Sequence, residues 1–414
     1  MSQWKDEAPP SALRPQRGGS PTAASVLYRD AIVDRLWEAL CAGESIVLSA
    51  EKRVGKTAVM RVLEARATDE VVVIYRDVEG VGSPRRLAEL LAQDVLPRLG
   101  GLDKARHRLR DLVEKVGGTS VGPVTLPDME GPGWRSSLDD LFGSLDDHLE
   151  SQEQVVVVIW DEAPWMVDKV RRDCGWEVAV DLLDELRAAR DRYRRIRFVF
   201  TGSIGFHHVL RSLRDGRSHR ATLNTMRDEE LPPLAPADAG RLAWALLRWT
   251  AEHGLTTPVI ALPDLAERVG EVCEGIPWFI HAAVDDLARL GEPIDLAAVD
   301  QVAADARFAP NDGWELAHYE DRLPEYYGED ALTAGLALDA VAVRGTASTA
   351  EVAADLQHHG SEHDEASARK LLELLQADHY LRRGPDGWTF TYRLIREAWL
   401  DRRDLRQPEG MGHP

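Results

Sequence analysis

Short apolar runs alternate with amphipathic stretches between residue 25 and residue 232 of the chain. The apolar runs are rich in β-branched residues and lie at residues 45–49, 71–75, 155–160 and 196–201. Apolar positions at helical spacing fill the stretches between these runs, at residues 56–66, 84–99, 136–149 and 178–194. Strands that alternate with helices predict a parallel sheet with helices on both faces. The expected fold class is therefore α/β, with three layers.

The alternation ends at a proline-rich joint at residues 231–236, after which only helical patterns follow to residue 305. Three further helical patterns and a short hairpin close the chain, which is the order of a winged helix-turn-helix. The first residues contain many prolines and glycines and few large apolar side chains, so they are expected to be disordered. The predicted boundaries are a tail at 1–24, an α/β domain at 25–232, a helical lid at 233–308, a linker at 309–328, a winged helix domain at 329–405 and a tail at 406–414. Within the α/β domain, residues 117–134 are expected to form a loop or small hairpin.

The loop after the first predicted strand carries the strongest chemical signal, because residues 49–57 read Ser-Ala-Glu-Lys-Arg-Val-Gly-Lys-Thr. Gly55 lets the backbone approach phosphates, and loop N–H groups at the start of a helix favour anions. Lys56 can supply a cation for the β- and γ-phosphates, and the Thr57 hydroxyl can ligate Mg²⁺. The usual pattern begins with Gly where this chain has Ala50. A chance Gly-Lys-Thr at the start of a surface helix is the alternative.

Two carboxylates, Asp161 and Glu162, end the apolar run at residues 155–160. Parallel sheets bind ligands at the carboxyl ends of their strands, where the phosphate loop also lies. Asp161 can hold Mg²⁺ there, and Glu162 can orient an attacking water as general base. The alternative is that both acids cap the following helix. Because they follow a phosphate loop in the expected order, they favour a P-loop NTPase site for ATP and Mg²⁺.

The run at residues 196–201 ends in Thr201-Gly-Ser203, beside the preceding strand. A hydroxyl of Thr201 or Ser203 can sense the γ-phosphate or position water there, although an ordinary strand-to-turn ending explains the same residues. An arginine finger must reach a γ-phosphate from a loop or a neighbour. The candidates are Arg171, Arg172, Arg211, Arg214 and Arg220, for each of which surface solvation is the favoured alternative.

These motifs together resemble the prokaryotic P-loop ATPases called the archaeal-type ATPase family, within the broader STAND and AAA-like group. The resemblance covers about residues 27 to 400. It is carried by Tyr28-Arg29-Asp30, which looks like the family's entry near the adenine, by Lys52-Arg-Val-Gly-Lys-Thr57, by Asp161-Glu162-Ala-Pro-Trp165, by Thr201-Gly-Ser203, by Gly275-Ile-Pro277, and by residues 318–327. The sequence departs from the family at Ala50 and at Glu274, where a second Gly is common.

The resemblance implies an ATP-driven switch whose lid and winged helix move with nucleotide state. The implied nucleotide contacts are Arg29, Arg53, Val54, Gly55, Lys56, Thr57, Ala58 and Pro277. The implied metal ligands are Thr57 and Asp161, and the implied catalytic residues are Lys56, Glu162, Thr201 and Ser203. Pro277 has a structural alternative as the first residue of a helix. The departure at Ala50 bears on the rate of hydrolysis more than on binding.

The net charge of −20 bears on the expected partners, because a protein that binds polyanions usually presents a basic face. The predicted recognition helix, at about residues 364 to 377, sets Arg369 and Lys370 against three acidic residues. A docking or autoinhibitory role is therefore favoured over DNA reading, and a protein partner or self-association is expected. Two alternatives stay open: an ATP-dependent DNA-binding regulator with little or no hydrolysis, and a scaffold that binds ATP without turnover.

Cellular location is predicted from apolar runs and cysteines. No run approaches the roughly 18 apolar residues that a membrane span needs, and the N-terminus lacks the apolar core of a signal peptide. Cys41, Cys174 and Cys273 lie far apart without a CxxC spacing, which favours reduced thiols. A cytoplasmic protein is expected. The histidines at residues 358–363 lie in a Gly-Ser stretch, where a solvated turn is favoured over a metal site.

Overall fold

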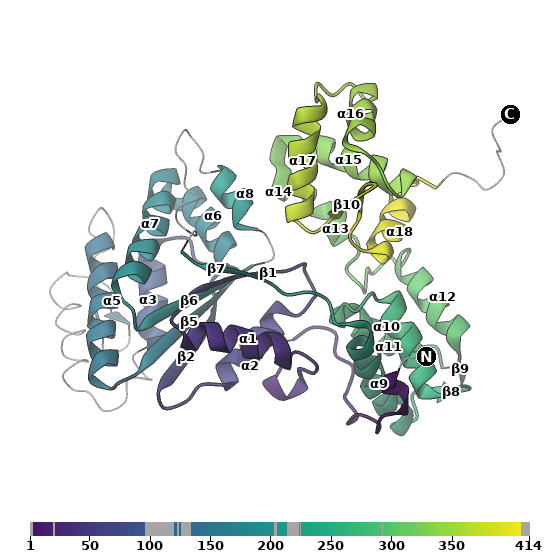
Figure 1. Cartoon of the computed structure of the whole chain (residues 1–414), viewed down its shortest axis with the longest axis horizontal. Helices are drawn as coiled ribbons and strands as arrows, with labels where there is room; N and C mark the ends of the chain where they lie inside the picture. The colour runs from purple at the N-terminus through teal and green to yellow at the C-terminus, as the bar shows by residue number, and fades with distance from the viewer. Residues whose placement is uncertain are drawn as a thin grey trace. The chain divides into compact units, whose positions relative to one another are not determined.

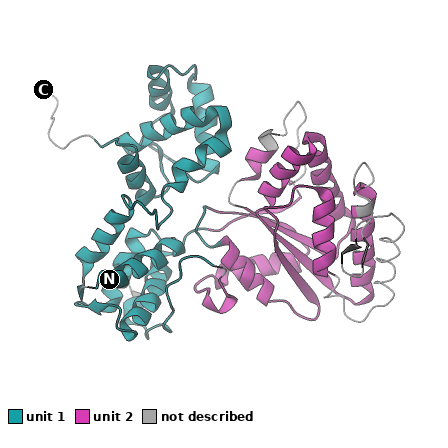
Figure 2. Cartoon of the chain, turned by 180° about the vertical axis from the view of Figure 1, so that it is seen from behind, with its two compact units in different colours: residues 1–19, 51–55, 232–414 teal, residues 20–50, 56–231 magenta. Residues whose placement is uncertain are grey.

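A computed structural model describes residues 3–19, 21–95, 120–121, 124–125, 134–202, 205–212, 223, 225–291 and 293–406. The chain divides into two compact units, coloured magenta and teal in Figure 2. The sheet unit comprises residues 20–50 and 56–231, and the helical unit comprises residues 1–19, 51–55 and 232–414. Among the described helices, none is both long and apolar enough to span a membrane.

A parallel sheet of five strands, in the order β2-β5-β6-β1-β7, forms the centre of the sheet unit (Figure 1). The strands are β1 (Ile46–Ser49), β2 (Val71–Asp77), β5 (Val155–Asp161), β6 (Ile196–Thr201) and β7 (Arg227–Glu230). Every residue of β5 after Val155 is buried, which requires cover on both faces of the sheet. The three-layer α/β prediction for this region is confirmed.

Helices of the sheet unit connect and cover these strands. They are α1 (Asp30–Cys41), α2 (Lys56–Ala65), α3 (Pro84–Val95), α5 (Trp134–Ser151), α6 (Ala163–Cys174), α7 (Trp176–Arg192) and α8 (Phe206–Ser212), with the short 3-10 helix η2 (Ala23–Ser25). Trp160 of β5 stacks on Phe200 of β6 with ring centroids 5.6 Å apart. Such pairs bury large apolar surfaces and fix the register of the two central strands.

The strand β7 has no counterpart among the predicted elements. Its sequence, Arg-Asp-Glu-Glu, is polar, and three of its four residues are exposed, so no apolar pattern marks it. It pairs in parallel with β1 at the end of the sheet order. Edge strands of this kind are exposed along one side and can be charged. In the insertion at residues 117–134, β3 (Ser120–Val121) pairs antiparallel with β4 (Val124–Thr125), and the rest of the insertion up to residue 133 lies outside the described residues.

The helical unit contains two groups of helices in chain order. The first group is α9 (Pro236–Glu252), α10 (Leu262–Val272), α11 (Pro277–Arg289) and α12 (Leu296–Ala306), with the short parallel strands β8 (Thr257–Pro258) and β9 (Pro293–Ile294). The helices α13 (His318–Asp321) and α14 (Leu323–Tyr327) and the 3-10 helix η4 (Gly328–Asp330) lead into the second group. We call residues 331–402 the C-terminal module.

The C-terminal module consists of three helices, a hairpin and a final helix. Its elements are α15 (Ala331–Arg344), α16 (Thr349–His358), α17 (Glu365–Ala377), β10 (Leu381–Gly384), β11 (Gly387–Phe390) and α18 (Arg393–Arg402). The strands β10 and β11 pair antiparallel, and Ala347 forms an additional antiparallel bridge with Trp388. This order agrees with the predicted elements and adds α18. The name winged helix stays a prediction.

The N-terminal segment differs from the expected disordered tail, because residues 3–19 pack within the helical unit. Trp4, in the 3-10 helix η1 (Gln3–Asp6), is 3% exposed and lies 6.1 Å from Trp244 between ring centroids. Lys5 forms an ion pair with Asp264 at 2.7 Å. The buried Trp4 and the ion pairs of Lys5, Glu7 and Arg17 therefore hold a segment whose average composition predicts disorder.

Candidate functional site

The phosphate loop, residues 50–55, connects β1 to α2, and Lys56 is the first residue of that helix. Gly55 has a φ of 105°, a conformation that L side chains rarely adopt. Ala50 is 4% exposed and has no positive φ, so alanine fits where the usual pattern has glycine. Lys56 Nζ donates to the Ala50 carbonyl oxygen at 2.9 Å. The Lys56 side chain thus folds back along the phosphate loop, where a phosphate would also bind.

Thr57, Tyr75 and Asp161 form a polar cluster that we call the metal corner. Thr57 Oγ1 and Tyr75 Oη both donate to Asp161 Oδ2, each at 2.9 Å. Asp161 is 4% exposed, and its Oδ1 has no hydrogen-bond partner among the described residues. Burial, together with the charge of Asp161 and the hydrogen bond to it, raises the pKa of Tyr75, so its hydroxyl keeps its proton and donates.

The metal corner fits a magnesium ion by its chemistry. Mg²⁺ prefers oxygen ligands and is usually held by one or two carboxylates besides water and phosphate oxygens. A buried carboxylate oxygen without a partner is uncommon in a folded protein and needs a reason. Asp161 Oδ1, next to the Thr57 hydroxyl at the carboxyl end of β5, offers such an oxygen. Thr57 and Asp161 were predicted from the sequence as metal ligands, whereas no motif indicated Tyr75, which is the fifth residue of β2.

Glu162 precedes α6 in a left-handed conformation, with φ 59° and ψ 34°, and its side chain makes no capping hydrogen bond to that helix. Asp161 is likewise engaged with Thr57 and Tyr75, so the alternative in which both acids cap the helix is not what the structure shows. A Cβ added to Gly202 would lie 2.6 Å from Pro164 Cδ and 3.3 Å from Glu162 Oε2. The glycine after β6 therefore leaves room for the Glu162 carboxylate.

Thr201 ends β6 and is 1% exposed. Its Oγ1 is buried without a hydrogen-bond partner in the part of the chain that the structure describes. A buried hydroxyl in this state keeps both its donor and its acceptor capacity. Ser203, the other hydroxyl predicted here, lies outside the described residues.

Residues 51–55 of the phosphate loop belong to the helical unit. The Arg53 guanidinium lies over the Trp278 ring, 4.0 Å from its centroid, and forms an ion pair with Glu315. Val54 is fully buried, and Lys52 Nζ lies 3.2 Å from His318 Nδ1. Arg53 and Val54, both predicted to contact nucleotide, are thus held by protein side chains or burial. No motif in the sequence indicates that Arg53 contacts Glu315 and Trp278.

The remaining predicted site residues that the structure describes lie at or near the ends of helices. Arg29 is 7% exposed and immediately precedes α1, and Ala58 lies in the first turn of α2. Pro277 is the first residue of α11, which matches its structural alternative. Arg171 and Arg172 both pair with Asp168 of their own helix, and the side chains of the other arginine-finger candidates lie outside the described residues.

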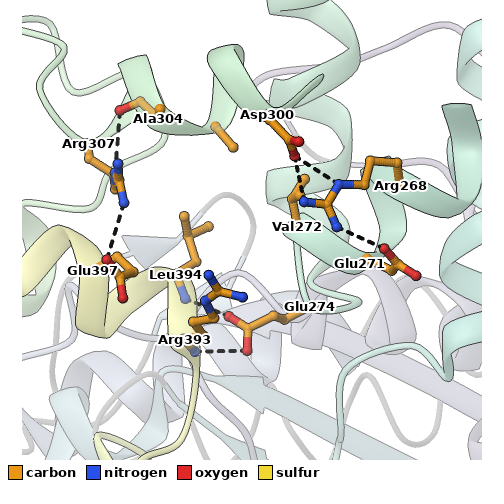
Figure 3. A pocket seen from close by; sticks show the side chains of 11 residues that line it. Arg268, Glu271, Val272, Glu274, Asp300, Ala304, Arg307, Arg393, Leu394 and Glu397 are labelled. Carbon is orange, nitrogen blue, oxygen red and sulfur yellow. Dashed lines mark hydrogen bonds and ion pairs between the residues drawn. The ribbon is translucent and has the colours of Figure 1, made fainter. Parts of the chain in front are cut away.

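A separate pocket of about 500 Å³ lies in the helical unit, lined by α10, α12 and α18 (Figure 3). Its charges largely satisfy one another: Arg268 pairs with Glu271 and with Asp300. Glu274 accepts hydrogen bonds from the backbone N–H groups of Arg393 and Leu394, at 2.8 and 2.7 Å. We assign no ligand to this pocket. The Glu274 carboxylate caps the N-terminus of α18, which explains why this chain has glutamate where the family pattern commonly has glycine.

Comparison with known proteins agrees with the geometry of the sheet unit. The sequence matches the AAA domain family over residues 42–210, a range that contains the phosphate loop, the metal corner and Glu162. Residues 42–210 form an AAA-like P-loop domain. The match to this family supports ATP as the bound nucleotide. No curated protein matches the chain.

Solved structures resemble the AAA-like chain over most of its length. A Walker-type ATPase of Pyrococcus abyssi has a TM-score of 0.59 at 17% identity, and the match covers 94% of this chain and 98% of that one. The ORC2 protein of Aeropyrum pernix has a TM-score of 0.47 at 13% identity, with 97% and 98% covered. The ORC1 protein of the same organism, in complex with DNA, has 0.39 at 17%, with 92% and 94% covered. The likeness to the Pyrococcus abyssi ATPase shows a shared fold.

Proposed function

We propose that this AAA-like protein is a molecular switch of the STAND kind that binds ATP with Mg²⁺ and hydrolyses it at a low rate. The observation that carries the proposal is the metal corner, where Asp161 keeps a buried oxygen without a partner among the described residues, beside the Thr57 hydroxyl. Thr57 of the corner lies one residue after Lys56 at the start of α2, an order that supports a role in phosphoryl transfer. The AAA match over residues 42–210 supports ATP as the nucleotide.

Each residue of the site would contribute a distinct interaction. The N–H groups of the phosphate loop and the start of α2 favour phosphate oxygens, and Lys56 would exchange the Ala50 carbonyl for the β- and γ-phosphates. Thr57 and Asp161 would hold Mg²⁺, which neutralises phosphate charge when bound. Glu162 would accept a proton from the attacking water, and the Thr201 hydroxyl would orient that water.

The first experiment compares Mg²⁺-dependent ATP binding and phosphate release in the native chain, Lys56→Ala and Glu162→Gln. We expect Lys56→Ala to lose binding by about a hundredfold, because a charge-assisted phosphate contact disappears. Glu162→Gln should bind ATP and release little phosphate. Lys169→Ala, which removes an exposed lysine paired with Asp173, is the matched control. A native chain that binds no nucleotide contradicts the proposal.

The helical unit would report the nucleotide state to a partner protein or to a second copy of the chain in the cytoplasm. Within it, the predicted lid at residues 233–308 and the predicted winged helix at 329–405 would be the moving parts. DNA reading by the C-terminal module is the second candidate, and the exposed Arg382 and Arg383 of β10 are the observation that favours it. A gel shift with duplex DNA at physiological salt tests it, since absence of binding at micromolar protein excludes that role.

A further inference from the structure

The phosphate loop takes part in a fully buried ion pair. Glu51, the residue after Ala50, pairs with Arg322 of the helical unit, with 3.1 Å between Oε1 and Nη1. The two side chains are 1% and 2% exposed. Charges removed from water to this extent are costly, and they persist only where a partner and further hydrogen bonds compensate them. We call Glu51 and Arg322 the loop clamp.

Arg322 connects the loop clamp to the C-terminal module. Its Nε donates to the Tyr380 hydroxyl at 2.6 Å, and its Nη2 donates to the Asp378 carbonyl oxygen at 3.3 Å. The guanidinium carbon lies 4.2 Å from the centroid of the Tyr380 ring and 4.8 Å from that of Tyr319. Every guanidinium nitrogen is therefore used. The arginine is held in place by the residues that join α17 to β10.

Glu51 connects the loop clamp to the phosphate-binding backbone. Its Oε1 also accepts the backbone N–H of Lys52 at 2.8 Å. N–H groups of this loop are the groups that a phosphate would contact, so the carboxylate lies among anion-binding donors. A phosphate that approached a bare Glu51 carboxylate would meet a like charge in a poorly solvated place. The positive charge of Arg322 removes that repulsion.

We propose that Arg322 is a positioning residue for the phosphate loop, which acts through Glu51 and makes nucleotide binding and the packing of the C-terminal module depend on one another. The inference rests on the proposed binding of ATP and adds the path by which the site and the module communicate. Because such coupling is reciprocal, whatever loosens Tyr380 and Asp378 around Arg322 weakens nucleotide binding, and nucleotide binding changes the surroundings of Tyr380.

A double-mutant cycle tests this coupling with calorimetric binding of ATP and of ADP to the full chain. Arg322→Gln leaves the Glu51 carboxylate uncompensated, so we expect both affinities to fall at least about tenfold. Adding Glu51→Gln removes that charge, and the double variant should recover to within about threefold of the native affinity. Arg344→Gln, which breaks a pair with Asp355 inside the C-terminal module, is the control and should bind normally.

Hydrogen exchange supplies the second measurement and covers the case in which Arg322→Gln fails to fold. In the native chain, nucleotide should change the protection of backbone N–H groups at residues 378–390, and in the double variant that change should disappear. An Arg322→Gln variant that binds ATP like the native chain overturns the inference and leaves the proposed function intact. Equal loss in the single and double variants also overturns it. A native chain without nucleotide affinity removes the proposed function itself.

Discussion

The metal corner and the loop clamp both adjoin the phosphate loop, and they differ in the hydrogen bonds of their central side chains, Asp161 and Arg322. In the corner, Asp161 is buried and keeps Oδ1 without a partner among the described residues. In the clamp, each guanidinium nitrogen of Arg322 has an acceptor, and aromatic rings stack on its faces. An open oxygen in a buried cluster suits a ligand that arrives later, whereas a guanidinium whose every nitrogen has an acceptor suits a fixed connection.

The two clusters also differ in their sequence separation. The corner joins the ends of β2 and β5 to the start of α2, which parallel strands bring to the same edge of the sheet. The clamp joins Glu51 and Arg322, which are 271 positions apart in the sequence. Arg322 lies between α13 and α14, and no strand pairing among the described residues fixes its position. The candidate ligand site thus follows from strand topology, while its proposed coupling to the C-terminal module rests on single side chains.

The largest expected effect comes from breaking the clamp. Arg322→Gln should destabilise the helical unit by about 3–5 kcal/mol, because the buried Glu51 carboxylate loses its partner. The measurement is the unfolding midpoint in urea, compared with Arg344→Gln, whose partly exposed pair should matter by less than about 1 kcal/mol. Equal midpoints for the two variants would show that the clamp is no more than another surface pair.

Overpacking next to the corner should have the next largest effect. Gly202→Ala places a Cβ 2.6 Å from Pro164 Cδ, so we expect a loss of stability of about 1–3 kcal/mol. The same methyl group lies 3.3 Å from Glu162 Oε2 and should displace that carboxylate. Phosphate release should therefore fall more than ATP affinity. Gly80→Ala, whose Cβ would meet no atom within 4 Å, is the matched control, and a similar loss there would contradict this explanation.

A smaller effect is expected at Glu274, which joins the end of α10 to the N-terminus of α18. Glu274→Ala leaves two backbone N–H groups without their acceptor, which should cost about 0.5–2 kcal/mol in unfolding free energy measured in urea. Glu397 of α18 also pairs with Arg307, the residue after α12, at 3.5 Å. That second contact limits the loss. A variant as stable as the native chain would contradict the capping role of Glu274.

The pH dependence at Glu274 has a definite sign. Burial raises the pKa of Glu274 above that of an ordinary glutamate, despite the two backbone hydrogen bonds that lower it. The folded chain therefore holds this proton more tightly than the unfolded chain, and the resulting stability is present below the ordinary glutamate pKa. It is lost as the pH rises through the raised pKa. As the pH rises over that window, the native chain should lose unfolding free energy relative to the Glu274→Gln variant. A difference that stays constant with pH would contradict it.

Regular patterns in the sequence predicted most of the sheet and the centre of the candidate site. Alternating runs identified the strands β1, β2, β5 and β6, and the motifs placed Thr57 and Asp161 at one edge of the sheet. The strand β7 was not predicted because it consists of charged residues at an exposed edge of the sheet. The N-terminal segment was not predicted because single side chains hold it: Trp4 is buried, and Glu7 and Arg17 pair with residues far away in the sequence.

Other parts of the site could not be predicted because they depend on contacts between distant segments. Nothing in the sequence around Glu51 indicates that it pairs with Arg322, since no periodicity or spacing connects the two residues. Tyr75 reads as an ordinary β-strand aromatic, and only the pairing of β2 with β5 brings its hydroxyl to Asp161. Glu274 departs from a family pattern in the sequence, and only the structure places its carboxylate at the start of α18.

The weakest effect is expected at Tyr75, which helps to orient Asp161 and leaves its Oδ1 available. Tyr75→Phe removes one of two hydrogen bonds to Asp161 Oδ2, so the carboxylate should be less well oriented toward Mg²⁺. We expect the Mg²⁺ affinity of the nucleotide complex, measured by metal titration, to fall by about 0.5–1.5 kcal/mol. Metal-free nucleotide affinity should stay unchanged. Tyr193→Phe, which loses a similar bond to Asp139 at 2.8 Å, is the control. Equal responses of the two variants would mean that Tyr75 only stabilises the sheet unit, and that the corner is oriented by Thr57 alone.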